Sequence, residues 1–139
     1  MGVVRGRGLR AGTAVGRVLV LGEALSLWGG ADAATGVITD ERHPRWGEKL
    51  GGRVVVMPGS RGSSSSASVL AEMLRVGVGP AAIVLPRADP ILVVGTLVAE
   101  ELYGLGIPIV ELTEVGELRE GVAVRVTVVG ADAVIEEEW

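Results

Sequence analysis

The residues best suited to chemistry lie in one short stretch, residues 58–68, with the sequence PGSRGSSSSAS. Before it, residues 53–57 include a run of valines, and such a β-branched run predicts a buried strand. After it, apolar residues recur at helical spacing over 69–74 and predict a helix. The stretch therefore carries hydroxyl groups and one arginine into the start of a helix.

A stretch of this kind can hold an anion. The first N–H groups of a helix have no partner within the helix, and the helix dipole adds partial positive charge there. Arg61 contributes a full charge and a planar fork of donors that suits a carboxylate or a phosphate. The alternative is a serine that merely caps the helix. Because capping needs only one serine, we expect a ligand-binding or catalytic loop.

The composition limits the class of protein. The chain has 139 residues, 48% of them hydrophobic and 22% charged, and we predict a single domain over residues 1–139. A net charge of −4 argues against nucleic acid or an anionic membrane as the partner. The longest apolar run, residues 91–99, is too short to span a bilayer, and residues 1–10 lead into no signal-type apolar segment. We therefore expect a cytoplasmic protein.

The chain has no cysteine and a single histidine, His43. These counts exclude a disulfide framework, a cysteine nucleophile and any thiolate-held cluster that this chain alone would supply. A site built from several histidines is excluded as well. We therefore expect no metal ligands from this chain.

About thirty residues of mostly loop character follow Leu21, and loops of this length are usually functional or disordered. Their tryptophan, paired glycines and His-Pro step do not suit disorder, so we predict an ordered loop that lines a site. Each polar or aromatic candidate also has an ordinary role: a hydrophobic plug for the tryptophan, a turn residue for the aspartate and a structural role for the histidine. The candidates are Trp28, Gly29, Gly30, Asp32 and His43.

The order of the elements predicts an α/β fold. Strands joined by helices give a parallel core, and antiparallel strands are added at the two ends of the chain. A mixed sheet with helices on one side and a second β layer on the other satisfies this order. The predicted elements are an irregular edge strand within 1–12, strand 16–21, the long loop, strand 53–57, the helix through 69–74, strand 81–85, a helix over 91–103 capped by Asp89, an edge strand or strand start at 107–110, a helical turn at 113–118, and a hairpin of 121–129 and 133–135.

Several of these motifs, in this order, resemble the small-subunit or swivel-domain family of aconitase X. The similarity covers essentially the whole chain, and the serine-rich motif is its most distinctive part. The sequence departs from the family at Ser66 and Ala67, where relatives commonly carry glycine, and this departure leaves open which hydroxyl faces the substrate. The matching segments are LSLWGGAD (25–32), TGVI (35–38), RHP (42–44), PGSRGSSSSASVL (58–70), PAAI (80–83) and IP (107–108).

The resemblance implies a swivelling β/β/α domain that closes over a 4Fe-4S iron–sulfur cluster. The cluster is expected on a separate, cysteine-containing large subunit, in agreement with the lack of cysteine here. The short chain looks like the split, two-subunit form of the family. Its expected partners are therefore that large subunit and a phosphorylated small-molecule carboxylate.

The resemblance also implies a hydro-lyase activity. Archaeal members act in the mevalonate pathway and remove water from mevalonate 5-phosphate, giving trans-anhydromevalonate 5-phosphate. Bacterial relatives are similar to dehydratases of hydroxyproline isomers, which are the alternative substrates.

Loss of water next to a carboxylate needs a base at the carbon and a Lewis acid on the departing hydroxyl. By analogy with the Gly-Ser-Ser-Arg motif of ordinary aconitases, Ser63 is the expected base, and Ser64 and Ser65 are its competitors. Ser60, Arg61 and Gly62 are expected to bind the substrate anion with the helix-start amides. The loop residues Trp28, Gly29, Gly30, Asp32 and His43 complete the expected wall of the site.

Two other classes of protein remain as alternatives. A non-catalytic anion-binding module would use the same helix start without any cysteine-rich partner. A phosphohistidine swivel domain would carry a phosphoryl group on His43. The Arg-His-Pro sequence does not place that histidine at a helix N-terminus, where a carrier histidine is expected.

Overall fold

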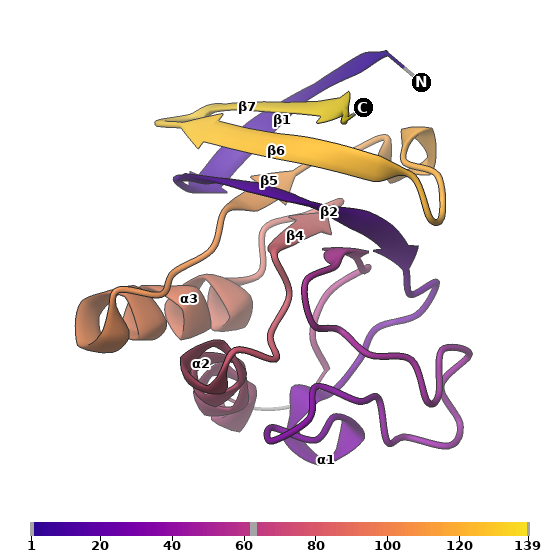
Figure 1. Cartoon of the computed structure of the whole chain (residues 1–139), viewed down its shortest axis with the longest axis vertical. Helices are drawn as coiled ribbons and strands as arrows, with labels where there is room; N and C mark the ends of the chain where they lie inside the picture. Colours follow the sequence, from indigo (N-terminus) through magenta and orange to yellow (C-terminus); the bar gives the residue numbers. More distant parts are fainter. Residues whose placement is uncertain (1, 62–63, 139) are drawn as a thin grey trace.

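The computed structural model describes residues 2–61 and 64–138, in which seven strands form one closed barrel (Figure 1). Around the barrel the strands follow the order β1-β5-β4-β3-β2-β6-β7, and β7 pairs with β1. Helices α2 (Ser65–Val76) and α3 (Pro90–Tyr103) lie together on one side of it (Figure 1). The strands are β1 (Val3–Arg10), β2 (Gly12–Val20), β3 (Val54–Val56), β4 (Ala82–Leu85), β5 (Ile109–Glu111), β6 (Ala123–Val129) and β7 (Asp132–Glu137).

The half of the barrel beside the helices is parallel. Strands β2, β3, β4 and β5 pair in sequence order, and helices α2 and α3 provide the last two connections. Strand β3 is buried on both faces, because Val54 and Val56 pack inside the barrel while Val55 packs toward the helices. This burial accounts for continuous apolar runs in place of alternating ones. The predicted parallel core with helices on one side is confirmed.

The opposite half consists of the antiparallel strands β6, β7 and β1. On β6, Val124, Val126 and Val128 face the barrel interior, and the residues between them are more exposed. The predicted C-terminal hairpin is confirmed by the β6–β7 register. This half is the predicted second β layer, joined to the parallel half in one barrel and not separate from it.

The prediction that residues 1–12 form an irregular edge strand is right only for part of β1: among the described residues, Val3–Gly6 pair with β7 alone, but the strand as a whole lies between β7 and β5 in the closed barrel. Strand β1 pairs with β7 on one side and with β5 on the other. The same pairing shows that Pro108 marks the start of β5 and not an edge. Closure of the barrel gives β1 a neighbouring strand on each side for part of its length, and the sequence of a single strand does not reveal such closure.

The two helices pack closely against each other. Asp89 accepts the Ile91 N–H at 3.0 Å and caps α3, as predicted, and Pro90 is its first residue. Gly77 caps the C-terminus of helix α2, and its φ of 83° is the left-handed conformation that glycine adopts easily. Gly95 on α3 approaches Ala67 and Leu70 of α2, where a larger residue would meet packed atoms.

Two short helical elements lie in the connecting loops. The predicted turn near 113–118 is confirmed as η1 (Val115–Glu117). Element α1 (Leu27–Gly30) interrupts the long loop, and its Trp28 and Gly29 have non-helical backbone angles. Among the helices formed by the described residues, none is long and apolar enough to cross a membrane.

The α2–α3 contact gives a stability prediction. A Cβ on Gly95 would lie 3.0 Å from both the Ala67 carbonyl oxygen and Leu70 Cδ2. Gly95→Val should therefore lower the free energy of unfolding by about 1–3 kcal/mol, measured by urea denaturation. Val94→Ala is the control, because Val94 is exposed on the same helix and its loss should matter little. Equal stability of Gly95→Val and the natural chain would contradict the described packing.

Candidate functional site

The serine-rich loop lies at the carboxyl edge of the parallel strands. It leaves β3 after Val56 and enters α2 at Ser65. The loop after β2 and the loop between β4 and α3 reach the same edge, because the strands are parallel. Ligands of α/β folds bind at this edge, where helix N-termini and loops converge.

Asp89 holds the serine loop in place. One of its oxygens, Oδ2, accepts the Ser60 N–H at 2.7 Å and the Ser60 hydroxyl at 2.8 Å. Its other oxygen caps α3 through Ile91. A half-buried carboxylate thus joins the loop after β3 to the helix after β4. Ser60, predicted to contact the substrate, donates a hydrogen bond from its hydroxyl to this carboxylate.

The long loop lies alongside the serine loop. Leu25 forms a parallel bridge with Ser60, and the Arg61 N–H donates to the Leu25 carbonyl at 3.2 Å. The side chain of Arg61 is exposed and has no ion-pair partner among the described residues. Its charge is therefore available at the site.

The serines at the start of α2 differ in how far they are buried. Ser64 is the N-cap residue, and its side chain makes no capping hydrogen bond. Ser64 and Ser65 are exposed, whereas Ser66 is fully buried and its Oγ has no hydrogen-bond partner within the described structure. Gly62 and Ser63, the predicted anion contact and base, lie outside the described residues.

The predicted residues of the long loop occupy different environments. The alternative role of Trp28 as a buried hydrophobic plug is wrong, since 66% of the residue is exposed. Gly29 has a φ of 81°, which favours glycine, and Gly30 is buried with its carbonyl accepting the Thr39 N–H at 2.9 Å. Asp32 is an exposed turn residue whose Oδ1 accepts the Ala34 N–H at 2.8 Å. Trp28 is thus an exposed residue of α1, and α1 packs against α2.

His43 is a buried residue with both ring nitrogens engaged. Its Nδ1 accepts the Arg45 N–H at 3.0 Å, so Nε2 carries the proton and donates to the Glu23 carbonyl at 3.2 Å. These bonds hold two parts of the long loop together. A ring in this state has no free nitrogen for phosphoryl transfer, and its 5% exposure hinders access.

A second anchor of the long loop was not apparent in the sequence. Glu120, just before β6, pairs with Arg45 at 2.7 Å and with Arg53 at 3.3 Å, and it also accepts the Val20 N–H at 2.8 Å. Residues so far apart in sequence carry no common motif. Only the barrel pairing of β2 with β6 brings them together.

The described residues contain no group of three or more histidine, cysteine, aspartate or glutamate side chains placed to hold a metal ion. The chain also has no cysteine. Its residues therefore do not fit the role of ligands to an iron–sulfur cluster. What the carboxyl edge offers is an exposed arginine, hydroxyl groups and helix-start amides, a set that suits an anion.

Comparisons with known proteins agree on one family. Residues 3–135 match the family described as the aconitase X swivel domain. The aconitase X of Thermococcus kodakaraensis, in its holo-form, superposes with a TM-score of 0.86 at 29% identity, covering 99% of this chain and 100% of that chain.

Curated relatives fall into two groups. The cis-3-hydroxy-L-proline dehydratase of Pseudomonas aeruginosa is 45% identical over 108 residues, which are 78% of this chain and 19% of that protein. The phosphomevalonate dehydratase small subunit of Pyrococcus furiosus is 36% identical, covering 88% of this chain and 87% of the subunit. That of Methanocella arvoryzae is 33% identical, covering 96% and 97%. The chain spans about a fifth of the length of the hydroxyproline dehydratases.

The Asp89 contacts give a prediction that separates its two roles. Asp89→Ser should still cap α3 through Ile91, because serine is a good N-cap, but its side chain is too short to reach Ser60. We expect the free energy of unfolding to change by less than about 1 kcal/mol while the Ser60 amide exchanges its hydrogen at least about tenfold faster. Asp89→Ala should lose both functions and about 1–2 kcal/mol of stability. Unchanged exchange at Ser60 in Asp89→Ser would contradict the anchoring role.

Proposed function

This chain belongs to the aconitase X swivel domain family, and from this premise we propose that it acts as the small subunit of a phosphomevalonate dehydratase. The reaction removes water from mevalonate 5-phosphate and gives trans-anhydromevalonate 5-phosphate. The observation that carries the proposal is the serine loop at the carboxyl edge, with the exposed Arg61 beside the start of α2.

The relatives support this choice of substrate. The alignment with the Methanocella subunit covers 97% of that subunit, so nearly every part of it has a counterpart in this chain. The Methanopyrus kandleri subunit reaches 49% identity over 83 residues. A substrate with both a carboxylate and a phosphate also suits a site that combines arginine with helix-start amides.

The proposal divides the chemistry between two subunits. This chain has no cysteine, so an iron–sulfur cluster would be held by a cysteine-containing large subunit. That cluster would supply Lewis-acid chemistry for the departing hydroxyl. The tasks left to this chain are to bind the anionic substrate and to take the proton from carbon.

Ser63 is the proposed base, and Ser64 and Ser65 are its competitors. A free serine is a poor base at neutral pH, because its alkoxide is high in energy. Helix-start amides and the positive charge of Arg61 would stabilise the alkoxide electrostatically. When the base takes the proton, the C–H electron pair forms the new C=C bond, the C–O bond breaks, and the departing hydroxide takes up a proton to become water. The proton that the base removed is then released, so that one water is lost overall.

The other predicted residues take supporting roles in this proposal. Arg61 would bind the substrate carboxylate or phosphate together with Gly62. Trp28, Gly29 and Gly30 would form the wall of the site beside the serine loop. Ser60 and His43 would position the loops, since their polar atoms already have partners within the chain.

Dehydration of a hydroxyproline is the second candidate. The 45% identity to the Pseudomonas cis-3-hydroxy-L-proline dehydratase favours it. This substrate also carries a hydroxyl on the carbon next to the one that loses the proton, so the same base chemistry applies. It has no phosphate, and a phosphate requirement therefore distinguishes the two candidates.

The test is an activity assay of this chain co-expressed with its large subunit and reconstituted anaerobically with iron and sulfide. Mevalonate 5-phosphate and cis-3-hydroxy-L-proline are offered separately, and loss of water is followed by NMR. Turnover of mevalonate 5-phosphate that requires both chains is the expected result. Turnover of the hydroxyproline alone would select the second candidate, and binding of phosphate by this chain without any partner or turnover would favour the anion-binding module.

The proposed base gives the next prediction. In the two-subunit enzyme, Ser63→Ala should lower kcat by about 10²–10⁴-fold, because a general base contributes about that much. Ser68→Ala is the control, since Ser68 is another exposed serine of α2 and is not among the proposed bases. A Ser63→Ala enzyme with normal kcat would move the base to Ser64 or Ser65, and the corresponding variants would identify it.

Arg61 gives a prediction about binding. Arg61→Ala removes the exposed positive charge of the serine loop while the backbone bond to Leu25 can remain. We expect KM for mevalonate 5-phosphate to rise about 10–100-fold, the loss of one charge-assisted contact. Arg42→Ala, at another exposed arginine, is the control. An unchanged KM in Arg61→Ala would exclude Arg61 from the anion site.

A further inference from the structure

The barrel has a gap in its strand pairing, here called the seam, along Val3–Gly6 of β1. On one side, β1 pairs with β7 from Val3 to Arg7. On the other side, its pairs with β5 run only from Arg7 to Arg10. Within the described residues, no strand pairs with Val3–Gly6 on the β5 side. In an antiparallel strand, alternate residues direct their N–H and C=O groups to each side, so the seam presents free backbone donors and acceptors.

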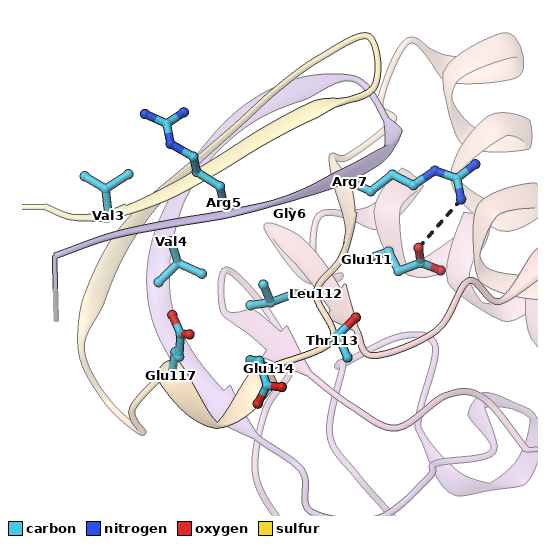
Figure 2. Close-up of a pocket in the computed structure, with 10 residues that line it drawn as sticks. All are labelled: Val3, Val4, Arg5, Gly6, Arg7, Glu111, Leu112, Thr113, Glu114 and Glu117. Carbon is cyan, nitrogen blue, oxygen red and sulfur yellow. Dashed lines mark ion pairs between the residues drawn. The ribbon is translucent and has the colours of Figure 1, made fainter.

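The seam opens because β5 is short. After Glu111 the chain leaves β1 and turns into η1, and Leu112 packs into the barrel interior. A Cβ on Gly6 would lie only 2.7 Å from the Glu111 carbonyl oxygen, which marks the last close approach of the two segments. A cavity of about 490 Å³ lies between them (Figure 2). It is lined by residues 3–7 of β1, by residues 111–114 and by Glu117.

Some of the charged side chains around the cavity form an ion pair and others do not. Arg7 forms an ion pair with Glu111 at 3.7 Å, so these two charges neutralise each other. The guanidinium of Arg5 points away from the η1 side (Figure 2). Glu114 and Glu117 are exposed on that side and have no ion-pair partner among the described residues. The seam therefore combines an open strand edge with two uncompensated carboxylates.

We propose that an extended segment of the large subunit that contains lysine or arginine adds to the free edge of β1, with its basic side chains at Glu114 and Glu117. Strand addition of this kind gains affinity from main-chain hydrogen bonds and specificity from the flanking side chains. The identity of the partner rests on the proposed function. A second copy of this chain is disfavoured, because the net charge of −4 opposes self-association.

The position of the seam favours the large subunit as the occupant. Glu111 ends β5 at the same carboxyl edge that carries the serine loop after β3, two strands away, or about 10 Å in the hydrogen-bonding direction. Glu111 Oε2 also accepts the Ala88 N–H at 2.7 Å, next to the Asp89 that holds Ser60. A partner that covers the serine loop along this edge is therefore close enough to reach the seam.

Hydrogen exchange of the full chain, alone and in the purified two-subunit complex, tests the docking directly. We expect the free amides within Val3–Gly6 to exchange at least tenfold more slowly in the complex. An active complex without this protection would overturn the inference and leave the proposed function intact. Failure to form any complex would overturn both. Concentration-dependent protection in the chain alone would make a second copy the occupant, which also overturns the inference.

Charge reversal tests the role of the carboxylates. A chain with Glu114→Lys and Glu117→Lys should bind the large subunit at least tenfold more weakly at low salt, and the difference should shrink at high salt. The control carries Glu48→Lys and Glu101→Lys, which change the net charge equally at exposed sites outside the seam. Equal binding of the two variants, both folded by circular dichroism, would show that the seam carboxylates do not contact the partner.

Discussion

The carboxylate of Asp89 is the interaction on which the site depends. It accepts hydrogen bonds from Ser60 and from the start of α3, so it fixes the loop after β3 against the helix after β4. Among the described residues 58–61, the backbone contacts to Leu25 would still define the path of the loop without this anchor, but no side chain would. A base and an anion site need positions fixed to a fraction of an ångström, and a half-buried charge with several donors provides such a fixed point.

The long loop is held by two further anchors, and each of them joins distant parts of the chain. The buried ring of His43 connects the Glu23 carbonyl to the Arg45 amide, and Glu120 connects Arg45 and Arg53 to the start of β6. The loop is thus fixed by hydrogen bonds and ion pairs as well as by core packing. Exposed Trp28 belongs to α1 of this loop, and α1 packs against α2.

The barrel explains how the serine loop and the unpaired part of β1 come to lie toward one edge of the sheet. Its parallel strands direct the serine loop and the end of β5 to the same side. Its antiparallel half closes the sheet, but the short β5 leaves part of β1 without a neighbour. In the proposed two-subunit enzyme, such surfaces would hold the partner in register with the serine loop.

The sequence alone was enough for most of the local structure and for the family. Runs of valine and isoleucine located β3 and β4, the Asp89-Pro90 step located the start of α3, and the serine-rich motif located the candidate site. These features depend on near neighbours in the chain, where periodicity, capping and turn preferences act. The closure of the barrel, the bond from Ser60 to Asp89, the Glu120 ion pairs and the exposure of Trp28 were decided only by the tertiary structure. Each of them depends on which distant segments become neighbours, and that follows from strand order and register, which local sequence patterns do not encode.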